Sequence, residues 1–175
     1  MHFNDVITAR HSCRHFDTAR KPSLSVLTDL CREALTAPSA CNSQPWKILL
    51  ISSPEALQKA KAAFHAPFVR DAAAIAVLCE TEAELKPFVI ERLGDSQFFA
   101  EYDLGILTGC LTLAAADHGV GSCIIGMFDQ DLLKSEFSLP EGVRPRLAVA
   151  LGYESPDATV PTRVRKPIDD TLTVL

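Results

Sequence analysis

Leu104-Gly-Ile-Leu-Thr-Gly-Cys-Leu-Thr-Leu-Ala-Ala-Ala116 is the longest apolar stretch of the chain, and only glycine and threonine interrupt it. Asp103 and Asp117 border this stretch, which is too short to cross a bilayer. The pattern around it predicts a helix over residues 97–118 that is apolar nearly all round. We therefore expect a buried helix at the centre of the hydrophobic core.

Shorter elements flank this helix on both sides. Strands are predicted over residues 46–52, 72–79 and 146–151, the second apolar enough to be central, with a short strand or turn over 122–125. Further helices are predicted over residues 3–9, from Pro22 to just before Ala37, from Pro54 onward, over 81–93 with an irregularity at Pro87, and over 129–137. Helices and strands mix without a strict βαβ alternation, so the fold class expected is α+β. Prolines beyond residue 155 predict an extended tail.

The composition is that of an ordinary globular protein. With 175 residues, 47% of them hydrophobic, the chain is expected to form one domain over residues 1–175. A net charge of −5 argues against a nucleic-acid surface. No secretory leader pattern and no membrane-spanning stretch is visible. The six cysteines form no Cys-x-x-Cys pair, so a cytoplasmic location is expected.

Two short basic segments stand near the two ends of this acidic chain. The first is Ala9-Arg10-His11-Ser12-Cys13-Arg14-His15-Phe16, and the second is Arg163-Val164-Arg165-Lys166. Such dense donors suit an anion gripped at several points, most commonly a phosphate. The sequence therefore predicts one anionic ligand between the N- and C-terminal segments.

Other interpretations of these segments remain open. The arginines could be solvated surface charges. His11 and His15 could bind a metal, although Arg10 and Arg14 would repel a cation. Cys13 could be a reactive thiol or an inert buried residue. The glycines at 119, 121 and 126 match neither a dinucleotide fingerprint nor a P-loop, and suit a helix stop followed by a tight turn.

Four motifs, spread over the chain, resemble those of the FMN-dependent nitroreductases. They are Arg10-His11-Ser12-Cys13-Arg14-His15-Phe16, Ala37-Pro38-Ser39-Ala40-Cys41-Asn42-Ser43-Gln44-Pro45-Trp46, Gly119-Val120-Gly121-Ser122-Cys123-Ile124-Ile125-Gly126, and Ala150-Leu151-Gly152-Tyr153 followed by Pro161-Thr162-Arg163-Val164-Arg165-Lys166-Pro167. The resemblance implies a three-layer α+β fold, in which helices flank a central, mostly antiparallel sheet. It also implies a homodimer with an extended C-terminal tail.

The same resemblance implies an FMN site at the subunit interface. Arg10, Ser12, Arg163 and Arg165 would hold the phosphate, His11 would lie beside the ribityl chain, and Arg14 would face the pyrimidine edge. Backbone N–H groups of Ile125 and Gly126 would approach the flavin N5, with Ile124 beside them. Pro38, Ser39, Ala40, Asn42 and Gln44 complete the expected set, with the loop arriving from the partner subunit. No metal and no catalytic side chain is expected.

The activity implied is that of an NAD(P)H-dependent flavin oxidoreductase. Hydride would pass through the flavin N5 to a nitroaromatic, a quinone or a similar planar acceptor by a ping-pong route. Two alternatives stay open: a flavin-binding protein with little turnover, and a thiol-based redox protein using Cys13. The chain is short for the family, and Ile125 suggests flat or apolar acceptors.

Overall fold

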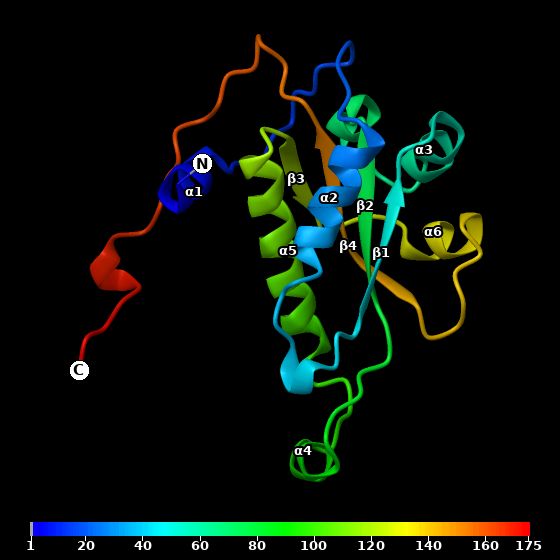
Figure 1. Cartoon of the computed structure of the whole chain (residues 1–175), viewed down its shortest axis with the longest axis vertical. Coiled ribbons are helices and arrows are strands. Elements are labelled where there is room, and N and C mark those ends of the chain that lie inside the picture. The colour runs from blue at the N-terminus through cyan, green and yellow to red at the C-terminus, as the bar shows by residue number, and fades with distance from the viewer. Residues whose placement is uncertain (1) are drawn as a thin grey trace.

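The computed structural model describes residues 2–175 and shows one antiparallel sheet with helices on both faces (Figure 1). The strands are β1 (Trp46–Ile51), β2 (Ala74–Glu80), β3 (Gly121–Ile125) and β4 (Arg144–Gly152), in the order β1-β2-β4-β3. Every neighbouring pair is antiparallel. The predicted α+β class and the antiparallel sheet are confirmed.

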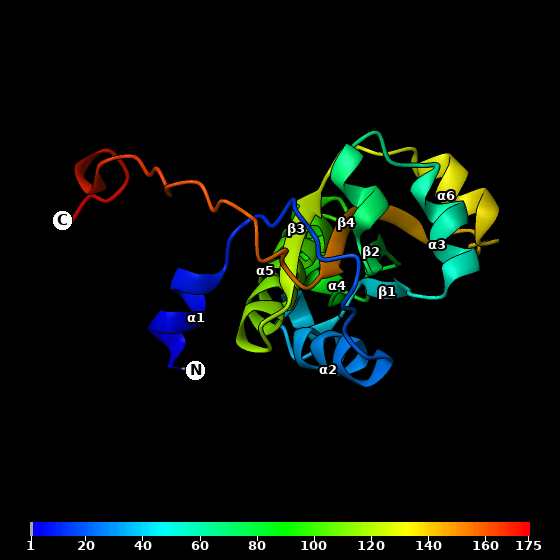
Figure 2. The ribbon, with the colours of Figure 1, turned by 90° about the horizontal axis from the view of Figure 1, so that it is seen from above.

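Helices form a layer on each face of the sheet, as the view from above shows (Figure 2). On one face lie α2 (Leu24–Ala34) and α5 (Ala100–Asp117), and on the other lie α3 (Pro54–Lys61) and α6 (Gln130–Glu136). The remaining elements are α1 (Phe3–Ala9), α4 (Pro87–Leu93) and the short 3₁₀ turns η1 (Ala40–Asn42), η2 (Pro67–Asp71) and η3 (Ile168–Asp170). The three-layer arrangement is therefore as predicted.

Strand β2 divides the hydrophobic core in two. All of its residues are buried, as its unbroken apolar run predicts. Because side chains alternate along a strand, Ile75, Val77 and Cys79 pack with α3 and α6. Ala74, Ala76 and Leu78 pack with α2 and α5 on the opposite face.

Helix α5 is the core helix that the sequence predicts, but its burial is one-sided. Leu104, Leu107 and Leu111 face the sheet and are fully buried. On the outer side, Tyr102 is 65% exposed and Ile106 is 43% exposed. Gly105 lies between these two residues in the sequence, and a Cβ at this position would meet no atom within 4 Å. The expectation that this helix is buried all round is wrong, because nothing in residues 2–175 covers one of its apolar faces. Over residues 2–175, no helix is both long and apolar enough to cross a membrane.

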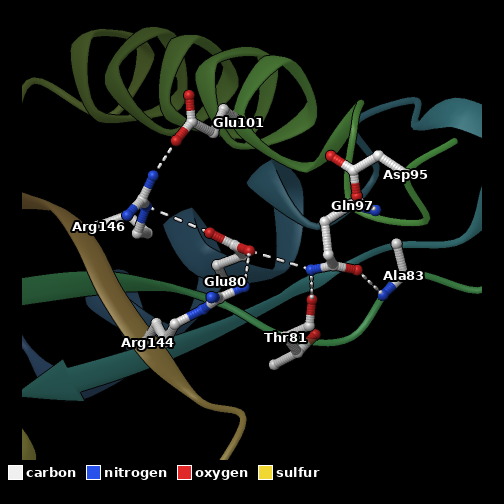
Figure 3. A network of polar contacts seen from close by, with 8 residues as sticks. All are labelled: Glu80, Thr81, Ala83, Asp95, Gln97, Glu101, Arg144 and Arg146. Carbon is white, nitrogen blue, oxygen red and sulfur yellow. Dashed lines mark hydrogen bonds and ion pairs between the residues drawn. The ribbon is translucent and has the colours of Figure 1, made fainter. Parts of the chain in front are cut away.

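The helix predicted over residues 81–93 is confined to α4, and residues 81–86 are irregular. Pro87 occupies the first turn of α4, where its missing N–H does no harm. The side chain of Gln97 holds the preceding segment: its Oε1 accepts a hydrogen bond from Ala83 N at 2.6 Å, and its Nε2 donates to Thr81 O at 2.9 Å (Figure 3). Tertiary contacts therefore override the local helical pattern.

The same network closes this end of the sheet. The carboxylate of Glu80 is buried at the end of β2 and pairs with Arg144 and Arg146 on β4 (Figure 3). Arg146 also pairs with Glu101 on α5, which ties the helix to the sheet. A buried carboxylate is tolerated here because it is paired and hydrogen-bonded.

The two chain ends extend away from the sheet. Figure 2 shows α1 and the tail reaching beyond the layers on the same side. Beyond residue 156, η3 is the only regular element, so the predicted extended tail is confirmed. Its apolar side chains, including Val164 and Ile168, are exposed.

Two glycines, Gly119 and Gly121, stand where α5 ends and β3 begins. Gly119 has a φ of 68°, the left-handed conformation that ends a helix. A Cβ on Gly121 would lie 2.8 Å from Cys13 Sγ and 3.1 Å from Gly152 O. The helix stop expected at Gly119 is therefore confirmed, but the tight turn expected after it is wrong, because strand β3 begins at Gly121. The missing side chain of Gly121 allows the N-terminal segment to pack against β3.

We expect Gly121→Ala to lower the free energy of unfolding by about 1–3 kcal/mol, because the added methyl group overpacks this contact. Urea unfolding monitored by circular dichroism measures the change. On a Cys13→Ala background the loss should be smaller, because Sγ is absent. Equal losses on both backgrounds would contradict the contact with Cys13 Sγ as their cause.

Candidate functional site

The first basic segment runs extended past the start of β3 and the end of β4. Cys13 N donates to Ser122 O at 2.9 Å, and Asp17 N donates to Tyr153 O at 2.8 Å. Cys13 and Phe16 point inward and are buried. Ser12 and Arg14 are therefore left on the exposed side of the segment.

The second basic segment reaches the first through Arg163. Its guanidinium donates to the carbonyl oxygens of Ile7 and Thr8, both at 3.0 Å, and to that of Arg10. These carbonyls lie at the C-terminal end of α1, where a positive charge is favourable. Arg163 thus anchors the tail to α1. The sequence does not predict these hydrogen bonds to backbone carbonyls. The predicted contact between Arg163 and a phosphate stays a prediction.

Together the two segments form a cavity of about 380 Å³. Its lining residues are Thr8, Arg10, His11, Ser12, Arg14, Val160, Pro161, Arg163 and Arg165. The predicted convergence of the two ends of the chain is therefore observed, and we call this hollow the arginine cavity.

The arginine cavity contains positive charge without a matching negative charge. Among residues 2–175, the guanidinium groups of Arg10 and Arg14 make no hydrogen bond or ion pair. Arg165 donates only to the neighbouring carbonyl of Val164, at 2.8 Å. Guanidinium groups hold phosphate and carboxylate well because their donors are charged and planar. The cavity is thus suited to an anion.

His11 connects this cavity to the end of β4. Its Nε2 lies 2.8 Å from Glu154 Oε1, and its Nδ1 lies 2.8 Å from Ala9 O. Desolvation by partial burial lowers the pKa of His11, but the hydrogen bonds to Glu154 and Ala9 outweigh it, and the net direction is upward. The protonated ring, which donates from both nitrogens, matches these two acceptors.

Cys13 has the properties of a structural residue. It is 1% exposed, and burial raises the pKa of its thiol to about 11. Its Sγ donates weakly to His15 O at 3.6 Å. A protonated thiol is a poor nucleophile, so these properties argue against the thiol-based alternative. Within the described part of the chain, no cluster of three or more His, Cys, Asp or Glu side chains could hold a metal ion.

The end of β3 corrects the expectations for Ile125. Its side chain is buried in the core beside α3 and α6, so it cannot shape the choice of an acceptor. The carbonyl of Ser122 points away from the sheet towards Cys13, and backbone groups alternate along an antiparallel strand. The alternation therefore directs the backbone of Ile124 outward and that of Ile125 towards β4. The backbone groups of Ile124 therefore lie on the unpaired edge of the sheet, and Gly126 follows in the exposed turn.

The loop at residues 38–44 does not reach the arginine cavity within one chain. Ala40 N donates to Asp103 at the start of α5, whereas Ala116 near the end of α5 borders a hollow shared with Arg10 and His11. Asp103 and Ala116 stand 13 positions apart on the helix, which is about 20 Å. Pro38, Ser39, Ala40, Asn42 and Gln44 therefore lie at the opposite end of α5 from the arginines.

Two acidic residues of this arrangement make contacts that the sequence does not predict. Glu154 binds His11, and Asp103 binds the loop through Ala40. The sequence marks Asp103 only as a border of the apolar stretch, and it predicts neither contact, because each contact joins segments far apart in the sequence. Only the folded arrangement reveals them.

We expect the His11–Glu154 pair to stabilise the fold in a pH-dependent way. The folded pKa of His11 lies above its ordinary value, so the contribution is fully present below about pH 6.5 and is lost as the pH rises through the folded pKa. Glu154→Gln should therefore lower the free energy of unfolding more at about pH 5.5 than at about pH 8.5. Chemical denaturation at both values measures this. The effect should be independent of pH on a His11→Gln background, and a constant loss in the wild-type background would refute the assignment.

Comparison with known proteins gives a consistent result. The model of the Nitroreductase family matches residues 7–101 and 59–153. The oxygen-insensitive NADPH nitroreductase of Helicobacter pylori is 27% identical over 195 aligned residues, covering 92% of this chain and 91% of the relative. The iodotyrosine deiodinase of Haliscomenobacter hydrossis is 24% identical over 184 aligned residues, covering 90% and 81%.

Solved structures agree with this family match. A nitroreductase family protein from Clostridium difficile 630 superposes with a TM-score of 0.82 at 26% identity, covering 99% of this chain and 98% of that one. A structure in complex with FMN from Exiguobacterium sibiricum gives a TM-score of 0.84 at 24% identity, covering 99% and 97%. Because the family model spans most of the sequence, the chain belongs to the nitroreductase family.

Proposed function

We propose that this protein is an FMN-dependent oxidoreductase that uses NAD(P)H and works as a homodimer. The observation that carries the proposal is the arginine cavity, where Arg10, Arg14 and Arg165 meet without acidic partners. Relatives named NADPH nitroreductases and a structural neighbour solved with FMN support it. So does family membership.

The side chains present fit the chemical groups of FMN. A phosphate needs several positive donors, which Arg10 and Arg165 provide with the exposed hydroxyl of Ser12 beside them. From Ser122, beside Ser12, the strand runs about 10 Å to Ile125, so a ligand whose phosphate lay near Ser12 could extend along this strand. The outward backbone of Ile124 and the exposed Gly126 would then lie near the ring.

Bound FMN would supply the hydride chemistry, taking hydride from reduced nicotinamide and passing it to an acceptor in a second, separate encounter. Arg14 would favour negative charge at the pyrimidine edge of the ring, because a nearby cation stabilises an anion. A backbone N–H at Ile124 or Gly126 would orient N5 without adding a titrating group. No acid or base of the protein takes part in this scheme.

The acceptor would meet an apolar surface. Ile124 is exposed, and Met127 beside Gly126 is 83% exposed. These side chains, rather than that of Ile125, would contact a planar molecule lying on the ring. Nitroaromatics and quinones fit this description, and the arrangement allows one pocket to serve nicotinamide and acceptor in turn.

Three features support the homodimer. The loop at 38–44 lies at the other end of α5 from the arginines, so a site containing both needs two chains. The outer face of α5 carries exposed Tyr102 and Ile106 around open space at Gly105. The extended tail exposes apolar side chains and has almost no regular structure of its own. A second copy would cover these surfaces.

The proposal is tested by the visible spectrum and by turnover. We expect protein incubated with FMN to stay yellow through gel filtration and to oxidise NADPH or NADH when a nitroaromatic or quinone is added. Retained flavin without turnover would instead support a flavin-binding protein. A colourless protein would refute the proposal.

Arg165→Ala should weaken FMN binding about 10- to 100-fold, because it removes a charge-assisted hydrogen bond to the phosphate. Quenching of flavin fluorescence during titration measures the Kd. Arg32→Ala is the matched control, since that guanidinium pairs with Asp29 on the exposed side of α2. Equal Kd values for Arg165→Ala and the wild type would remove Arg165 from the site.

Ile106→Asp should convert the dimer to a monomer and weaken FMN binding at the same time, because a charge on the α5 face opposes burial by a second copy. Sedimentation velocity measures the mass, and flavin titration measures the affinity. Ile106→Leu, which keeps the face apolar, should remain dimeric. A monomeric Ile106→Asp protein with wild-type affinity would show that the flavin site belongs to one chain.

A further inference from the structure

The loop at residues 38–44 has an unusual backbone. Cys41, Asn42 and Gln44 have φ values of 54°, 56° and 48°. Elsewhere in residues 2–175, only Ser138 among the non-glycine residues has a positive φ. Side chains disfavour this conformation, so it persists only where contacts impose it, and such residues concentrate at functional sites.

The hydrogen bonds inside the loop do not attach it to the rest of the protein. Ser39 Oγ accepts from Gln44 N at 2.9 Å, and Asn42 N donates to Ser39 O at 3.0 Å. These bonds join residues of the same loop and would move with it. The hydroxyl of Ser43 is buried without a partner, so the loop conformation leaves a polar group unsatisfied.

Asp103 provides the attachment. Its two carboxylate oxygens accept the N–H of Ala40 at 3.1 and 3.2 Å, across 63 positions of sequence. Asp103 is 4% exposed, and among the described residues no cation pairs with its carboxylate. Burial raises the pKa of this carboxyl group, and the hydrogen bond from Ala40 lowers it in part. Asp103 is therefore a desolvated carboxylate, and its one hydrogen-bond donor among the described residues is Ala40 N in the loop.

We infer that Asp103 is a positioning residue, which holds the 38–44 loop in the conformation that presents Asn42 to the flavin bound by the partner chain. The inference rests on the proposed function. A carboxylate in the first turn of a helix commonly caps that helix, but this one bonds to a distant loop, and α5 has no side-chain cap. Asn42 itself is exposed and donates no side-chain hydrogen bond within the described chain.

Two variants remove the contact from opposite sides. Asp103→Ala deletes the acceptor. Ala40→Pro deletes the donor, and the extended backbone of Ser39 (φ −141°, ψ 159°) is the conformation that a residue before proline requires. Asp103→Asn keeps an acceptor oxygen and is the conservative rescue. Thr108→Val is the matched control, because it removes a buried hydrogen bond to Leu104 from the same helix without touching the loop.

Two measurements on the whole chain of 175 residues separate positioning from general stability. Amide hydrogen exchange without FMN should rise at the amides that residues 39–44 retain in both contact variants, and should remain as in the wild type over the second half of α5. FMN titration should show Kd raised at least about tenfold in the two variants, and near the wild-type value in Asp103→Asn and Thr108→Val. Near-ultraviolet circular dichroism verifies that each variant is folded.

The outcomes distinguish this inference from the proposed function. Faster loop exchange together with weaker FMN binding supports it. A folded variant with wild-type FMN affinity, or with unchanged loop exchange, overturns it while leaving the proposed function intact. Failure of both contact variants to fold would make Asp103 a stability residue and also overturn it. A wild-type protein that binds no FMN would refute the proposed function itself, and this inference with it.

Discussion

The burial of β2 on both faces is the constraint on which the rest of the structure depends. A strand that is apolar on both sides needs two layers of helices, and α2, α5, α3 and α6 supply them. Apolar side chains fill the space between the sheet and each helix layer. Charged and amide groups therefore gather at the ends of α5, where the sheet stops and irregular segments begin.

Much of the fold could be predicted from sequence because its signals are local. The central strand, the core helix and the Pro-initiated helices follow from apolar runs and their boundaries. The failure over residues 81–86 has a non-local cause, since Gln97 holds that segment through Thr81 and Ala83. The exposed face of α5 escaped prediction for a related reason: composition shows that a helix is apolar, but not which neighbours cover it.

The candidate site could be predicted in its residue types more than in its contacts. Arg10, Arg14 and Arg165 line one cavity, as the two basic segments indicate. Arg163 lines it too, but the sequence could not show that its guanidinium binds backbone carbonyls of α1. The sequence also could not show the direction of the backbone groups of Ile125, because that direction depends on which edge of β3 pairs with β4. The contacts of Glu154 and Asp103 lacked any signal, because their partners are distant in sequence.

The arginine cavity gives this acidic chain a local positive region that can attract an anion. The chain as a whole has a net charge of −5, and its long-range field repels a phosphate. At physiological ionic strength, however, charges separated by more than about 8 Å are largely screened from one another. A ligand at the cavity mouth then feels the nearby guanidinium groups far more than the distant carboxylates. Dilute buffers extend the reach of the distant carboxylates, so the net negative charge of the chain opposes the approach of an anion most strongly at low ionic strength.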